Sequence, residues 1–470
     1  MQKSPHRLSR RWLIAYALPA APIAAMGLPL VVYLPPFYAG HMGFGLKLVG
    51  TVFLITRLWD VFVDPVLGLV SDRFPTRWGR RRHWIALSVP IMVLSTYMVF
   101  MPAPGVGSRY LIFWMLVLYV GWSLLTLSHA AWGAELTDDY HERTRVQSAR
   151  QFVLIVGLVL VLLLPAATDA LHPANLDAAR VASMGWFVIL FLPLAVAWAL
   201  WQVPESAVPP RPHISLRQGI GVLLTNRPLQ LLLAADLISG VSGGIVASMF
   251  LFLADDVLRL GKFSSVLLLV YFISGIAFIG PILRISRRVG KHRTAAGSAL
   301  FTVCCIPTIW LLPPGEPLLA VLVFLLLGVN YAAAPFLYLS MMADVADHDT
   351  VATGQARTGL FFSLLTMTNK LGAALAIWIA YSLLDAVGFH PGLANTAAAL
   401  TGFKAAFTGP SFFIQATVAL LLWRFPIDEA KQRANRDLLE RRSLGAVATA
   451  VEVSTSQPSD PGPLRSPASD

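Results

Sequence analysis

Three charged residues in an otherwise apolar stretch are the part of this sequence best suited to chemistry. Arg57, Asp60 and Asp64 are spaced three and four residues apart among Val, Leu, Ile, Phe and Trp residues. On a helix this spacing places all three side chains along one face. Because a charge at the centre of a bilayer costs roughly 2.5–3.5 kcal/mol, the stretch predicts a membrane helix whose charged face looks into a polar interior.

The two carboxylates allow two interpretations. Arg57 could form a structural ion pair with one of them, but one arginine cannot neutralise both. Two carboxylates one helical turn apart repel each other, so either one of them holds a proton or both share a cation. We favour a cation-coupling site at Asp60 and Asp64, where the ion is a proton or a sodium ion.

The composition defines the elements that must position this site. The chain has 470 residues, of which 56% are hydrophobic and 13% charged, with a mean hydropathy of +0.66. Soluble proteins are about 25% charged, and apolar runs long enough to cross a bilayer recur here along most of the length. The chain is therefore predicted to be an all-α, multi-pass membrane protein. The adjacent Cys304 and Cys305 lie in an apolar segment and have no metal-ligand spacing, so we expect them to be packing residues.

Hydropathy and loop charge predict the topology. The expected spans, with ends uncertain by several residues, are about 12–36, 44–70, 83–102, 109–133, 148–168, 181–203, 227–253, 264–284, 294–313, 317–342, 358–385 and 401–424. Lys and Arg gather in every second loop, so the positive-inside rule places those loops and both termini in the cytoplasm. The net charge of +11 belongs to these short loops, which argues against nucleic acid as a partner. No convincing cleavage pattern follows the basic N-terminus, so the first span is expected to be retained.

The spans divide into two halves. Residues 1–203 and 227–426 each supply six of them, and the Pro-rich, basic stretch 204–226 is predicted to be a cytoplasmic linker. The halves show weak internal similarity at matching offsets, as parallel repeats about an axis along the membrane normal would. Residues 427–470 are expected to form a short amphipathic segment and a largely disordered cytoplasmic tail.

A longer motif surrounds the charged helix. Gly68, Asp72, Arg73, Gly79 and Arg80 resemble the loop between helices II and III of the major facilitator superfamily. The wider string, RLWDVFVDP followed by SDR and RWGRRR, is similar to the glycoside–pentoside–hexuronide:cation symporters, the family of the melibiose carrier. This resemblance implies a twelve-helix fold of two pseudo-symmetric six-helix bundles around a central cavity.

The resemblance also assigns a coupling site. In the family, helix II carries the cation-binding acids, which match Asp60 and Asp64, and a helix XI lysine facing them matches Lys370. A lone Lys in an apolar span needs an anionic partner, although it could instead snorkel to an interface. The acids that the melibiose carrier has on helices I and IV are replaced here by Ala24 and Thr126. Galactoside specificity is therefore not implied, and Thr126 favours a proton over sodium because a proton needs fewer oxygen ligands.

Four residues are candidates for binding the substrate. Arg57 shares the charged face, and Arg150 matches the arginine that opens helix V in the family. His129 could pass on a proton near the carboxylates, or simply hydrogen-bond to a neighbour. Trp132 could stack on a sugar face, or serve as an interfacial belt residue.

Charged residues at the cytoplasmic helix ends are candidates for gating, since such groups pair across the halves in the superfamily. They could equally be solvated surface charges. These candidates are Asp72, Arg73, Arg80, Glu135, Arg145, Asp344, Asp347 and Arg357. Asp236 is an isolated acid in the seventh span, and the sequence assigns it no role.

The resemblance implies cation-coupled uptake of a sugar or glycoside by a monomer in the inner membrane of a bacterium. No cofactor is expected, and the absence of a GxxxxGK[ST] string argues against ATP-driven transport. A lipid or amphiphile carrier on the same fold is one alternative, which would need an apolar, laterally open cavity. A polytopic membrane enzyme is a more distant one, because no loop is large and no metal spacing occurs. We therefore expect a transporter rather than an enzyme.

Overall fold

The computed structural model describes residues 8–74, 76, 78–137, 139–171, 176–204, 221, 223–331, 333–355 and 357–441, apart from the side chains at 72, 73, 140 and 141. Regular structure within these residues is helical throughout, with one isolated bridge between Thr76 and Gly79. The prediction of an all-α protein is confirmed.

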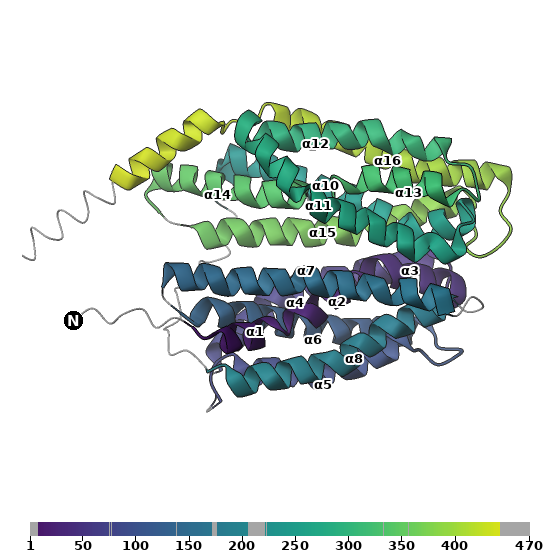
Figure 1. Ribbon diagram of the computed structural model, residues 1–470, viewed down its shortest axis with the longest axis horizontal. Coiled ribbons are helices and arrows are strands. Elements are labelled where there is room, and N and C mark those ends of the chain that lie inside the picture. The colour runs from purple at the N-terminus through teal and green to yellow at the C-terminus, as the bar shows by residue number, and fades with distance from the viewer. Residues whose placement is uncertain are drawn as a thin grey trace, which may run out of the picture.

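The helices form two sets, drawn as a lower purple-to-teal layer and an upper green-to-yellow layer in Figure 1. The first set, called the N set, contains α1 (Arg10–Ala17), α2 (Ala20–Gly27), α3 (Leu34–Pro36), α4 (Leu46–Arg73), α5 (Arg82–Phe100), α6 (Ser108–Glu135), α7 (Tyr140–Leu171) and α8 (Leu176–Gln202), with π-helical turns η1 (Pro29–Tyr33) and η2 (Phe37–His41).

The second set, called the C set, follows in the chain. It contains α10 (Arg227–Phe252), η3 (Leu253–Val257), η4 (Gly261–Phe263), α11 (Ser264–Val289), α12 (Lys291–Cys305), η5 (Ile306–Leu311), α13 (Pro317–Gly328), α14 (Ala333–Thr353), α15 (Thr358–Ala386) and α16 (Ala397–Trp423). A further helix spans residues 429–441. The predicted linker lies largely outside the described residues, so the domain boundaries stay a prediction.

The first membrane crossing is a chain of short helical pieces. Proline removes a backbone donor and clashes with the preceding turn, and Pro19, Pro29 and Pro35 stand at the beginnings of α2, η1 and α3. The π-helical turns absorb the resulting misfit. The crossing still continues to His41, five residues beyond its predicted end at 36.

Eleven helical segments of the described chain are long and apolar enough to cross a membrane. α4 has 28 residues but too many charges for that criterion, among them Arg57, Asp60 and Asp64. It lies within the N set and packs along α6 and α15, so we count it as the twelfth crossing. The charges that made α4 informative in the sequence are also those that lower its hydropathy.

The two sets meet chiefly where α15 packs along α4 and α11 packs along α7. Glycine allows the closest approach: a Cβ added to Gly50 on α4 would lie 3.2 Å from the Tyr381 Cβ and 3.4 Å from the Trp378 Cα. Small residues bring membrane helices together in this way because dispersion contacts, rather than a hydrophobic effect, hold them in lipid.

The connections alternate between two ends of the molecule. We call the end at which α4, α6 and α14 finish the basic end, and the end that carries residues 42–45, 101–107 and 387–396 the opposite end. The described start of the chain and helix 429–441 both lie at the basic end, at the left of Figure 1.

Cysteine labelling tests the predicted orientation. Arg288→Cys lies at the basic end and Leu393→Cys at the opposite end, and both positions are exposed. In a background with Cys304 and Cys305 replaced by serine, an impermeant maleimide should label Arg288→Cys only from the cytoplasm and Leu393→Cys only from outside. Labelling of both positions from the same side would contradict the twelve-crossing topology.

Candidate functional site

An ion-pair cluster joins the two sets halfway along α4 and α15. Lys370 Nζ on α15 lies 2.8 Å from Asp60 Oδ2 and 2.5 Å from Asp64 Oδ2, both on α4. Arg57 Nη1 lies 3.7 Å from the same Asp60 oxygen. The predicted meeting of Lys370 with the two acids is therefore present. Two cations and two carboxylates make the cluster neutral overall, which is what burial between helices favours.

A serine that the sequence did not single out completes the cluster. Ser123 Oγ on α6 donates a 2.7 Å hydrogen bond to Asp60 Oδ1, and Asp60 is fully buried. Thr126 lies one turn further on, and its hydroxyl donates to the carbonyls of Trp122 and Ser123 in its own helix. The position matched to the family acid, Thr126, and the residue that contacts Asp60, Ser123, thus differ by three residues, about one helical turn.

Arg57 is held mainly by aromatic rings. Its guanidinium carbon lies 5.1 Å from the ring centre of Tyr119 and 5.6 Å from that of Trp122. Cation–π contacts of this kind stabilise a desolvated arginine by about 2 kcal/mol. The side chain is 7% exposed, and its Nε has no hydrogen-bond partner in the described structure.

The carboxylates retain capacity for a further ligand. Asp64 Oδ1 is buried and has no hydrogen-bond partner in the part of the chain described, and Asp60 Oδ2 meets Lys370 as an ion pair without hydrogen-bond geometry. A carboxylate oxygen with a free lone pair can accept a proton or coordinate a cation. Within the described residues no group of three or more His, Cys, Asp or Glu side chains is placed to hold a metal ion, so any sodium bound here would depend on the two Asp residues together with neutral oxygens.

Two of the four substrate candidates lie away from this cluster. His129 is buried and stacks on Tyr16 with ring centres 4.6 Å apart, while its Nε2 is 2.7 Å from the Tyr16 carbonyl. Trp132 is fully buried and points its Nε1 towards the carbonyl of Pro204 at 3.4 Å. Both side chains therefore pack the N set in this conformation and present no face to a ligand.

Arg150 lies half-buried on α7. It forms no ion pair with any of the described residues. Its Nε is enclosed without a hydrogen-bond partner in that part of the chain. A cation left in this state can bind an anionic or hydroxyl-rich ligand, so its assignment as a substrate residue stays a prediction.

The gating candidates of the N set pair within that set. Glu135 bonds to both Arg80 and Arg81, at 2.9 Å from Arg81 Nη2. Arg145 pairs with Glu142 at 3.1 Å. The side chains of Asp72 and Arg73 lie outside the described residues.

The C set behaves in the same way. Asp344 meets Lys291 at 2.6 Å and Gln432 of helix 429–441 at 2.5 Å, and Arg357 meets Asp349 at 2.8 Å. Asp347 forms no ion pair within the described chain. The ion pairs described at the basic end thus join residues of one set.

The opposite end has an inter-set lock that sequence reasoning missed. Arg180 on α8 is 1% exposed and pairs with Asp169 of its own set at 2.7 Å. Its Nη1 reaches Asp255 of the C set at 2.9 Å, and its Nη2 donates to the carbonyl of Gly261 at 2.9 Å. Ser264 also donates to Asp255. The only sequence signal for this group was that its charged residues lie at span ends on the side where the loops carry few Lys and Arg residues.

The contact between α4 and α15 opens towards the basic end. Gly359, Ser363 and Thr366 share the helical face of Lys370, and all three are exposed. A Cβ added to Gly359 would meet nothing within 4 Å, whereas Gly50 beyond the ion pairs is tightly packed. Lys370 itself is 23% exposed. The ion-pair cluster therefore has exposed residues of α15 on its basic-end side and close helix packing on its opposite-end side.

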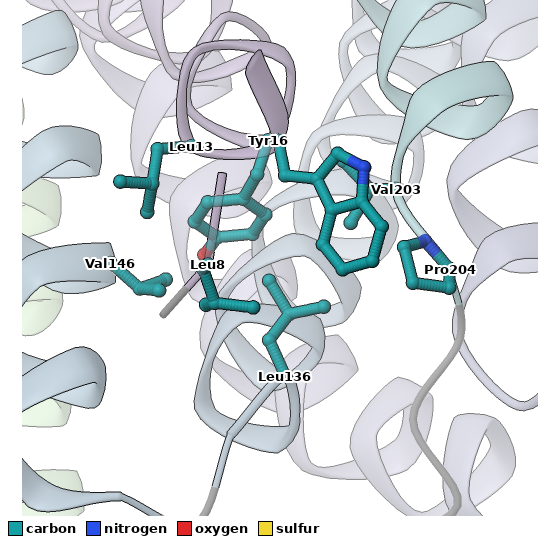
Figure 2. Close-up of a pocket in the computed structure, with 8 residues that line it drawn as sticks. Leu8, Leu13, Tyr16, Leu136, Val146, Val203 and Pro204 are labelled. Atoms are coloured by element: carbon teal, nitrogen blue, oxygen red, sulfur yellow. The ribbon is translucent and has the colours of Figure 1, made fainter. Parts of the chain in front are cut away.

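The pocket in Figure 2 is a separate feature within the N set. It lies near the basic end among apolar side chains: Leu8, Trp12, Leu13, Tyr16, Leu136, Val146, Val203 and Pro204. None of the described residues that line it is charged, and it does not reach the ion-pair cluster. It is therefore not a suitable site for ion coupling.

Comparison with known proteins agrees with this arrangement. The profile of the MFS/sugar transport protein family matches residues 15–429. An uncharacterized symporter of Synechocystis sp. is 25% identical, with 88% of this chain and 93% of that protein aligned. A glucuronide carrier protein homolog of Escherichia coli is 23% identical, covering 90% of this chain and 94% of the relative. The crystal structure of a D-xylose-proton symporter superposes with a TM-score of 0.64 at 14% identity, covering 88% and 96% of the chains.

The structural match supports the fold, and the family match extends over both helical sets and the whole ion-pair cluster. The predicted resemblance to glycoside–pentoside–hexuronide:cation symporters is confirmed. This multi-pass membrane protein belongs to the MFS/sugar transport protein family of the major facilitator superfamily.

Proposed function

We propose that the protein is a symporter that takes up a sugar or glycoside with a cation by alternating access, and that Asp60, Asp64 and Lys370 form its coupling site. The observation that carries this proposal is the Lys370 bridge, which joins the two sets through the two carboxylates. An ion that binds the carboxylates must compete with the ammonium group for the same oxygens.

This competition supplies the coupling. In the ion-free state, Lys370 and Arg57 balance the two carboxylates, so the empty carrier can change conformation with a neutral cluster. A cation bound to Asp64 displaces the ammonium group and leaves the cluster with an unbalanced positive charge. This charge opposes the conformational change of the carrier until the substrate is also bound. Charges in a low-dielectric setting are costly when unpaired, so a cation crossing alone is disfavoured.

The substrate is proposed to bind on the basic-end side of this cluster, along the exposed face of α15. Ser363, Thr366 and Lys370 supply polar groups on α15, and Arg150 on α7 supplies a guanidinium that forms no ion pair within the described residues. A lipid carrier would need an apolar lining instead, which the polar face of α15 does not favour. We further propose the bacterial inner membrane as the location, with the basic end in the cytoplasm.

The experiment is uptake by purified protein in sealed vesicles. A panel of labelled glycosides is offered under an imposed proton gradient, an imposed sodium gradient, or neither. We expect accumulation with one gradient, and Thr126 in place of a family carboxylate favours the proton. Accumulation that persists when both gradients are collapsed would contradict cation coupling.

A further inference from the structure

A second membrane carboxylate stands apart from the coupling cluster. Asp236 lies on α10, nine residues and roughly 14 Å from the start of that helix. It is 5% exposed, and no ion pair to it is formed in the described part of the chain. Its hydrogen-bond donor is Thr368 on α15, whose Oγ1 lies 2.8 Å from Asp236 Oδ2. A lone ionisable group in a membrane span is expensive to keep charged and marks a functional site by default.

The Thr368 hydroxyl can satisfy both protonation states of Asp236. It has a single hydrogen, yet two acceptors lie within reach, Asp236 Oδ2 at 2.8 Å and the carbonyl of Leu365 at 2.9 Å. When Asp236 is charged, Thr368 donates to the carboxylate. When Asp236 is neutral, its O–H donates to Thr368, which turns its own hydrogen to Leu365. The two states therefore exchange by rotating one hydroxyl group, with the heavy atoms in place.

Close packing holds this relay in position. Asp236 and Gly240 are one turn apart on the α10 face that meets α15, and Thr368 and Gly372 are one turn apart on α15. A Cβ added to Gly372 would lie 2.7 Å from the Leu237 carbonyl oxygen. Since the two backbones are in contact here, the distance between Asp236 and Thr368 is fixed by the fold.

Ionisable groups on the helices packed against α10 form their hydrogen bonds and ion pairs with residues other than Asp236, although Tyr338 lies close enough to interact with its charge. Tyr338 on α14 shares a 2.9 Å hydrogen bond with Ser239, and Lys370 on α15 turns to α4. Lys404 on α16 donates to the carbonyl of Leu312. The remaining charged side chains on these helices form no ion pair with Asp236 in the described residues: Asp344, Asp347, His348, Asp349 and Asp385. Thr368 is therefore the group in direct hydrogen-bond contact with Asp236 in the described residues.

We propose that Asp236 is a second proton-binding site, loaded and emptied during the transport cycle that was proposed above and on which this role rests. A proton from water adds to Asp236 Oδ2 as an O–H bond and returns to water on release, with no other bond changed. Thr368 and Lys370 are two residues apart and so lie on nearly opposite sides of α15. This helix thus contacts both ionisable sites and can respond to the occupancy of each.

Infrared difference spectroscopy tests the site without relying on transport. The purified full-length protein in lipid vesicles is titrated, and the C=O stretch of protonated carboxyl groups is followed. We expect a titrating band in the wild-type protein that Asp236→Asn removes. Identical wild-type and Asp236→Asn titrations would overturn the proposal.

Two Thr368 variants test the relay. Thr368→Val removes the donor to the charged form, so the midpoint of the Asp236 band should move to higher pH by about one unit, a tenfold gain in proton affinity. Thr368→Ser keeps the hydroxyl and should leave the midpoint in place. Ser239→Ala, which removes a neighbouring hydrogen bond, is the control and should also have no effect. An unmoved midpoint in Thr368→Val would show that the relay does not act on Asp236.

Transport separates this proposal from the function on which it rests. With a proton gradient driving uptake, Asp236→Asn should lower the number of protons taken up per substrate by one. Wild-type vesicles that accumulate no substrate under either gradient would contradict the symport function, while the infrared band would still report the site. Wild-type accumulation with an unchanged proton-to-substrate ratio in Asp236→Asn would contradict the role of Asp236 alone.

Discussion

Replacing Asp64 with asparagine is expected to abolish gradient-driven accumulation of substrate while preserving exchange of substrate down its own gradient. The asparagine side chain has the shape of the carboxylate without its charge, so the ion would lose its binding oxygens and Lys370 its 2.5 Å partner. Losing a coordinating carboxylate oxygen lowers the affinity of the site for the ion, and breaking the ion pair with Lys370 removes the contact that joins the two sets here.

The measurement is accumulation in reconstituted vesicles under an imposed proton or sodium gradient, compared with counterflow in the absence of a gradient. Asp385→Asn is the matched control, because Asp385 is an exposed carboxylate on the same helix as Lys370. Lys370→Ala should also fail to accumulate substrate, since it leaves two acids without their ammonium partner. Full coupling in Asp64→Asn would place the coupling site elsewhere.

The second large effect concerns the Arg180 lock. Asp255→Asn should favour opening of the opposite end, because Asp255 is the carboxylate that Arg180 reaches across the two sets at 2.9 Å. Asp169 stays with Arg180 in the N set, so the arginine remains paired when the sets separate. A hydrogen bond between charged groups contributes about 1.5–3 kcal/mol, so the open population should rise about tenfold or more.

Ser265→Cys can report this opening. Ser265 is a small, fully buried residue near the start of α11, close to the opposite end. In the background that lacks Cys304 and Cys305, an impermeant thiol reagent added from outside should label Ser265→Cys faster when Asp255→Asn is also present. Asp177→Asn is the matched control: it removes a carboxylate that also pairs with Arg180, but within the N set and half exposed. If both acid variants accelerate labelling equally, the inter-set pair is not the lock.

The sequence alone determined the class of fold and singled out the two acids that meet Lys370 in the ion-pair cluster. The density of apolar runs requires helices, because every backbone polar group in a bilayer must be bonded within the chain. Charge inside such a run is costly enough to single out Arg57, Asp60, Asp64 and Lys370 without any coordinates. The motif that begins at Arg57 then identified the family, which the match over residues 15–429 confirms.

Side-chain partnerships within the N set depended on tertiary structure. Ser123, rather than Thr126, meets Asp60, because the rotation of α6 about its axis is fixed by packing and a serine carries no hydropathy signal. His129 and Trp132 were polar or aromatic enough to suggest a ligand site, yet they pack against the first crossing. Sequence spacing defines a helical face but does not state what that face contacts.

The conformational state was decided by tertiary structure alone. Pairs such as Arg80 with Glu135 and Arg357 with Asp349 could have crossed between the sets, and only the coordinates place them within one set each. Arg180 and Asp255 are 75 residues apart in sequence and meet because the two sets close at the opposite end. The alternating access proposed above would require one sequence to form two arrangements, so its local patterns cannot specify either. The balance of inter-set contacts selects the one seen here.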